Sequence, residues 1–85
     1  MHAVYVIQND VTKETYIGYT TDLKARLASH NARGQKYTTR TQGNWAYAYV
    51  ELFRNEDDAR ARERRLKDHG SGKRELFKRL SKSVL

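Results

Sequence analysis

The stretch HAVYVIQNDVTKETYIGYT, residues 2–20, decides how this chain folds. Its first part, residues 2–8, carries β-branched and aromatic side chains at both alternating positions, which predicts a strand covered on both faces. Asn9-Asp10 then indicates a turn. Residues 15–19 have the composition of a second short strand, and the short polar segment before them makes an antiparallel hairpin the simplest connection.

The first helix is expected directly after this hairpin. Thr21 can cap free backbone amides with its side-chain oxygen, and the carboxylate of Asp22 suits the positive end of a helix. We therefore expect a helix that runs through about Asn31. Residues 32–44 contain two glycines and show no apolar periodicity, which indicates a basic loop.

The rest of the chain predicts a third strand and two more helices. Residues 45–53 resume strand character, and the spacing of Asn55 and Asp58 resembles a capping box that opens a helix ending near Gly70. A last helix over about residues 73–83 places three apolar side chains and the one just after it at helical spacing, Leu76, Phe77, Leu80 and Val84. The order β-β-α-β-α-α predicts an α+β fold, with a small three-stranded antiparallel or mixed sheet flanked by three helices.

Length and composition fit a single folded domain over residues 1–85. Hydrophobic residues make up 38% of the chain, and no proline, repeat or low-complexity segment divides it. With no cysteine there is neither a disulfide framework nor a thiolate metal site. The apolar runs are far shorter than the ~20 residues that span a bilayer, and no signal sequence is visible. We expect a cytoplasmic protein with no membrane partner.

The charge balance indicates the kind of partner. Seventeen Lys and Arg against ten Asp and Glu leave a net charge of +7 on a 10.0 kDa chain. A field of that sign concentrates polyanions near the surface, so nucleic acid is the expected partner. The alternative is that the excess charge only keeps a small protein soluble.

The first two predicted helices turn polar side chains inward. By spacing, four residues share one face of the first helix, Leu23, Arg26, Leu27 and His30. The second helix places the Glu63 carboxylate between Ala59 and Leu66 on the face that should meet the sheet. Taken singly, each has a structural explanation: Arg26 can lay its stem on the core, His30 can pack as a half-buried ring, and Glu63 can pair with an arginine or lie at an edge position that is still hydrated.

Two tyrosines of the hairpin complete the set. In an antiparallel hairpin Tyr5 and Tyr16 can be neighbours, whereas Tyr47 and Tyr49 are expected to serve as strand packing. Two strand tyrosines, an inward arginine and histidine on one helix and an inward glutamate on another are unlike a chance collection of structural residues. Together they describe a phosphodiesterase site.

These residues resemble those of the GIY-YIG nuclease superfamily. Its two strand motifs correspond to Ala3-Val4-Tyr5 and Tyr16-Ile17-Gly18; the second matches fully, and the first keeps the tyrosine. The resemblance continues through Arg26, His30 and Glu63, where the family carries its helix arginine, in several branches a histidine, and its metal-binding glutamate. Nearly the whole chain is covered, in the pattern of small stand-alone bacterial members and of the nuclease domain of the UvrC-like and homing endonucleases.

The resemblance implies a metal-dependent endonuclease that hydrolyses phosphodiester bonds in DNA, or in RNA, with low intrinsic sequence specificity. It implies that Glu63 holds Mg²⁺ or Mn²⁺ and that Arg26 neutralises charge on the phosphorus centre. Tyr5, or alternatively Tyr16, would take the proton of the attacking water, while Tyr16 and His30 orient water and phosphate. A free tyrosine has a pKa near ~10, so such a base needs positive groups beside it.

Two further expectations concern the surroundings of this site. Gly18, which lacks a side chain, lets a helix or the substrate approach its strand closely. The basic loop offers four nucleic-acid contacts, Arg33, Lys36, Tyr37 and Arg40. The alternative function is a catalytically weak or inactive nucleic-acid-binding module of the same fold. A monomer or a transient dimer is expected, and DNA repair is one pathway in which such an enzyme would act.

Overall fold

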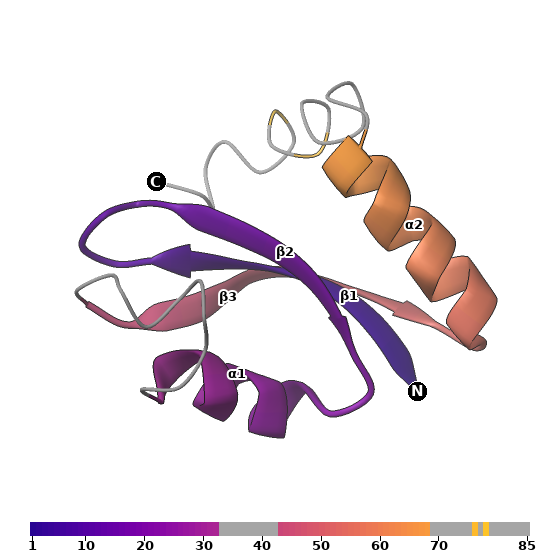
Figure 1. Cartoon of the computed structure of the whole chain (residues 1–85), viewed down its shortest axis with the longest axis horizontal. Helices are drawn as coiled ribbons and strands as arrows, with labels where there is room; N and C mark the ends of the chain where they lie inside the picture. The colour runs from indigo at the N-terminus through magenta and orange to yellow at the C-terminus, as the bar shows by residue number, and fades with distance from the viewer. Residues whose placement is uncertain (33–42, 69–75, 77, 79–85) are drawn as a thin grey trace.

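The computed structural model describes residues 1–32, 43–68, 76 and 78, in which a three-stranded sheet is covered by two helices (Figure 1). The strands are β1 (His2–Asn9), β2 (Thr15–Thr20) and β3 (Trp45–Phe53), and the helices are α1 (Leu23–Asn31) and α2 (Glu56–Asp68). Strand β1 lies in the centre, with β2 and β3 antiparallel on its two sides. The α+β class and an antiparallel sheet are confirmed.

The predicted last helix, residues 73–83, falls almost entirely outside the described residues. Leu76 and Lys78 are the positions in it that the structure describes, and Leu76 is buried against the core. A third helix therefore stays a prediction. Among the described residues, no helix is both long enough and apolar enough to cross a membrane.

The central strand is covered on both faces, as its sequence predicts. Residues 3–7 of β1 are all at most 2% exposed. On one face, Val4 and Val6 pack with Ala59 and Leu66 of α2. The other face carries Tyr5 and Ile7 of β1, which pack against the α1 residues Leu23 and Leu27. The two helices thus lie on opposite faces of the sheet, as Figure 1 shows.

The register of the hairpin brings the two motif tyrosines to one face. Tyr5 pairs with Gly18, and Ile7 pairs with Tyr16. Because side chains alternate along strands, Tyr5 and Tyr16 are diagonal neighbours on the face that α1 covers. A Cβ atom at Gly18 would overlap the hydroxyl of Tyr5. Glycine is therefore needed at position 18 because the Tyr5 side chain lies across the neighbouring strand at this point.

Helix α1 begins at Leu23, one residue later than a cap at Thr21 predicts. The N-cap is Asp22, whose carboxylate accepts a hydrogen bond from the backbone N–H of Ala25 at 3.0 Å. Thr20, not Thr21, supports this turn, because its Oγ1 accepts from the N–H of Asp22 at 3.0 Å. The expectation that Thr21 caps the helix was wrong, whereas the end of the helix at Asn31 is confirmed.

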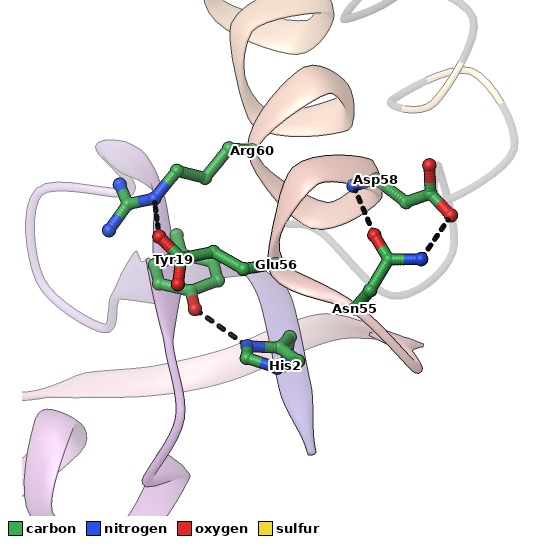
Figure 2. Close-up of polar contacts among 6 residues, drawn as sticks. All are labelled: His2, Tyr19, Asn55, Glu56, Asp58 and Arg60. Atoms are coloured by element: carbon green, nitrogen blue, oxygen red, sulfur yellow. Dashed lines mark hydrogen bonds and ion pairs between the residues drawn. The ribbon is translucent and has the colours of Figure 1, made fainter.

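Helix α2 begins with the predicted Asn55–Asp58 pair (Figure 2). The Asn55 side-chain oxygen accepts from the backbone N–H of Asp58 at 2.8 Å, and the Asn55 amide donates to the Asp58 carboxylate at 3.0 Å. The second bond joins two side chains, whereas the usual capping box returns to the backbone. The structure describes the helix to Asp68, so an end near Gly70 lies outside the described residues.

Candidate active site

The Tyr5 hydroxyl is the centre of a buried polar cluster between β1 and α1. Tyr5 is 0% exposed, and its hydroxyl oxygen accepts a hydrogen bond from Nε of Arg26 at 3.1 Å. The same hydroxyl lies 2.7 Å from Nε2 of His30. Since the inward face of α1 carries Arg26 and His30 one turn apart, a single strand tyrosine can bond to both. Arg26 and His30 lie on the same face of α1, in agreement with the helical spacing predicted for these two residues.

His30 is buried more deeply than an ordinary half-buried ring. It is 2% exposed, and it meets the Tyr5 ring edge-on with centroids 5.8 Å apart. The ring of Tyr16, which is partly exposed, lies 5.0 Å from that of His30. Tyr5, Tyr16, Arg26 and His30 are therefore brought together on the α1 side of the sheet.

Two residues outside the predicted site hold this cluster in place: Tyr47, which was expected to serve as strand packing, and Asn31, which was expected to end the first helix. The Tyr47 ring meets Tyr5 edge-on at 5.5 Å, and its hydroxyl donates to the backbone carbonyl of Leu23 at the start of α1. At the other end of α1, the Asn31 side chain accepts from the N–H of Trp45 at 2.7 Å and donates to its carbonyl at 3.1 Å. Both ends of α1 are thus tied to β3, which fixes the position of Arg26 and His30.

Glu63 approaches the cluster from α2. Its side chain is 16% exposed, and Ala59 and Leu66 on the same helical face are buried, as predicted. The carboxylate pairs with the Lys67 ammonium at 3.0 Å, so its partner is a lysine one turn away and not the arginine that the structural explanation expected. Lys67 Nζ also lies 5.6 Å from the centroid of the Tyr16 ring, so the same ammonium is close to both the Glu63 carboxylate and the Tyr16 ring.

Burial and charge shift three pKa values in the cluster. Burial raises the pKa of the Tyr5 hydroxyl, and the hydrogen bond and charge of Arg26 only partly oppose this, while Tyr16 and Glu63 add to the rise. The expected lowering by positive neighbours is therefore outweighed at Tyr5. The pKa of Arg26 is raised, first by its hydrogen bond to Tyr5. Burial, with the nearby Arg26 charge, lowers the pKa of His30. At neutral pH Tyr5 and His30 are both uncharged.

The donor set limits what kind of metal the site suits. Among the described ranges, no group of three or more His, Asp or Glu side chains gathers in a way that could hold an ion. Glu63 offers one carboxylate, and a hard divalent cation completed by water and phosphate oxygens fits such a site. The four loop residues expected to contact nucleic acid, Arg33, Lys36, Tyr37 and Arg40, lie outside the described residues.

The comparisons with known proteins give one family. The chain is 39% identical over 67 residues to a UPF0213 protein of Staphylococcus haemolyticus, which covers 78% of this chain and 79% of that protein. It is 42% identical over 79 residues to a UPF0213 protein of Halobacterium salinarum, covering 91% of this chain and 99% of that protein. Against a UPF0213 protein of Streptococcus pyogenes the identity is 46% over 61 residues, or 71% of this chain and 64% of the relative. No solved structure gives a significant match.

Residues 1–76 match the sequence model of the GIY-YIG catalytic domain. This match contains both strand motifs, both described helices and all of the residues in the polar cluster. The chain therefore belongs to the GIY-YIG family.

Proposed function

We propose that this chain is a metal-dependent endonuclease that hydrolyses phosphodiester bonds in DNA, with low intrinsic sequence specificity, in the cytoplasm. Membership of the GIY-YIG family supports a nuclease with a nucleic-acid substrate, and nucleases of this family generally use divalent metal ions. The observation that carries the proposal is the hydrogen-bonded group of Tyr5, Arg26 and His30, with Tyr16 and Glu63 beside it.

Burial assigns different tasks to the two tyrosines. Tyr5 is fully buried, and its hydroxyl is bonded to Arg26 and lies against His30, so attacking water does not reach it in this arrangement. Tyr16 is partly exposed and lies on the same face. We therefore assign the proton of the attacking water to Tyr16, and we assign to Tyr5 the task of holding the Arg26 guanidinium in place.

Arg26 and Glu63 would act on the phosphate. Arg26 is only partly buried, so its guanidinium can reach the substrate and neutralise charge that builds on the phosphorus centre. Glu63 would hold Mg²⁺ or Mn²⁺, which when bound supplies Lewis-acid stabilisation of the phosphate oxygens. Lys67 must then leave the Glu63 carboxylate, and the substrate phosphate offers its ammonium a new anionic partner.

The Glu63–Lys67 ion pair also favours a second candidate function. A carboxylate that keeps its lysine holds no cation, and the same surface would then bind nucleic acid without cutting it. This is the catalytically weak binding module. The two functions predict different effects of divalent metal ions. The nuclease needs them to cut DNA, whereas in the binding module they only screen charges.

The test is nicking of supercoiled plasmid and of fluorescent single-stranded, duplex and branched DNA in Mg²⁺, Mn²⁺ or EDTA. Wild type is compared with Glu63→Ala and Arg26→Ala, and Arg65→Ala serves as a charge control on an exposed position of α2. We expect metal-dependent cutting by wild type and the control, and none by the two site variants. If no substrate is cut while all four proteins bind DNA with salt-sensitive affinity, the binding module is correct.

A further inference from the structure

Outside the polar cluster, a cationic side chain, Arg60, lies on α2 one turn before Glu63. The Arg60 guanidinium carbon is 4.3 Å from the centroid of the Tyr19 ring, and Arg60 Nε pairs with the Glu56 carboxylate at 2.8 Å. Tyr19 is itself held by His2, whose Nδ1 lies 2.7 Å from the tyrosine hydroxyl. In Figure 2 Arg60 contacts the Glu56 carboxylate through Nε, and no dashed line joins its two terminal nitrogens to the residues drawn. The Arg60 side chain is 49% exposed, so a cation is held at the surface by the Tyr19 ring and the Glu56 carboxylate.

This feature and the proposed active site share one edge of the molecule. Strand β2 is an edge strand, and α2 places a cation over a tyrosine at two points along it, Arg60 over Tyr19 and Lys67 over Tyr16. Arg60 and Lys67 are seven residues apart, or about 10 Å along the helix axis on nearly the same side. Glu63 lies between them in sequence. The hydrogen bond to Glu56 is the main cause of the raised pKa of Arg60, and the charge of Glu63 adds to it.

A nucleic-acid strand that ran along α2 from the proposed active site would meet Arg60 within a few nucleotides. Arg60 precedes Glu63 by one turn, about 5 Å along the helix axis. Successive phosphates of one duplex strand advance about 3.4 Å along the duplex axis. A strand whose scissile phosphate lies at Glu63 would therefore bring a phosphate one to three nucleotides away into reach of the Arg60 side chain.

We propose that Arg60, held on the Tyr19 ring, is a backbone-binding subsite that contacts a phosphate one to three nucleotides from the bond to be cut. The distance of this subsite from the cleaved bond rests on the proposed function, whereas the binding of a phosphate by Arg60 does not. Arginine suits such a subsite because its terminal N–H groups can bond a phosphate in a bidentate manner. The ion pair between Arg60 and Glu56 does not prevent phosphate binding. Ion pairs at the surface contribute little to stability, and this one uses Nε of Arg60.

Binding of labelled oligonucleotides to the full chain in EDTA tests the subsite without cleavage. The matched control for Arg60→Gln is Arg65→Gln, which removes the same charge from an exposed position about 140° around the same helix. We expect Arg60→Gln to weaken binding several-fold and to reduce the slope of log affinity against log salt by about one, with Arg65→Gln changing either much less. Tyr19→Leu, which keeps the net charge, should weaken binding in the same direction as Arg60→Gln.

The result that overturns the subsite is equal weakening by the two arginine substitutions, because net charge alone would then explain it. This outcome is separable from failure of the proposed function. If wild type cuts DNA but the two arginine variants bind alike, the subsite is wrong and the nuclease stands. If wild type cuts nothing but Arg60→Gln alone weakens binding, the subsite stands and the nuclease fails.

Discussion

Replacing Tyr5 by phenylalanine removes one hydroxyl from the most connected point of the polar cluster and leaves the ring in place. That hydroxyl accepts from Arg26 and lies against His30, and both partners lose it at once. The bond to neutral, buried His30 is worth about 1 kcal/mol, and the charge-assisted bond to Arg26 about 1.5–3 kcal/mol. Arg26 is only partly buried and can form hydrogen bonds with water instead, so the contribution of its bond to Tyr5 lies at the lower end of that range.

The expected loss of unfolding free energy is therefore about 2–3 kcal/mol. In a chain of this length, that corresponds to a fall in Tm of roughly 10–20 °C. Thermal and urea unfolding followed by circular dichroism measure it directly. Tyr19→Phe is the matched control, because its hydroxyl makes a part-buried bond to His2, and it should cost less than about 1 kcal/mol. Equal stabilities for Tyr5→Phe and wild type would refute the description of this cluster.

Three further outcomes follow from the same geometry. The pKa of His30 in the folded protein is lowered below 6.5, so the unfolded chain binds the proton more readily. The free energy of unfolding should therefore fall as the pH drops from about 6.5 towards that lowered value. In urea midpoints measured over a range of pH, His30→Gln should reduce the dependence on pH in this interval. Gly18→Ala places a Cβ against the Tyr5 hydroxyl and should cost about 1–3 kcal/mol in urea unfolding, with a fall in nicking rate. Leu66→Ala removes a fully buried core side chain distant from the hydroxyl network and should cost about 2–5 kcal/mol, which calorimetry would detect as a lower Tm.

The sequence predicts the elements of this fold because local patterns determine them. The β-branched run of β1 has apolar side chains at both alternating positions, and the structure covers both. The inward face of α1 follows from helical spacing, which is why Arg26 and His30 could be placed beside the sheet before the structure was known. The one-residue error at Thr21 arose because two adjacent capping residues, Thr21 and Asp22, compete for the same role.

Contacts that depend on the pairing of distant strands could not be predicted. Tyr47 supports Tyr5 only because β3 pairs with β1 in a register that shifts between Val6 and Ile7, and no local pattern reveals such an irregularity. The side chain of Asn31 forms hydrogen bonds with the backbone of Trp45, the first residue of β3, which lies 14 positions later in the sequence. The dominance of burial over charge at Tyr5 also required the packed structure, since desolvation depends on every neighbour.

In the proposed function this cluster cuts DNA with a divalent cation held at Glu63. The most direct test of this function is the single-turnover nicking rate as a function of Mg²⁺ concentration for wild type, Glu63→Gln and Lys67→Gln. We predict saturable Mg²⁺-dependent nicking by wild type and a loss of at least a hundredfold in Glu63→Gln. Lys67→Gln, which frees the carboxylate, should reach half-maximal rate at a lower Mg²⁺ concentration. Nicking by Glu63→Gln at the wild-type rate and with the same Mg²⁺ dependence would show that Glu63 does not hold the cation.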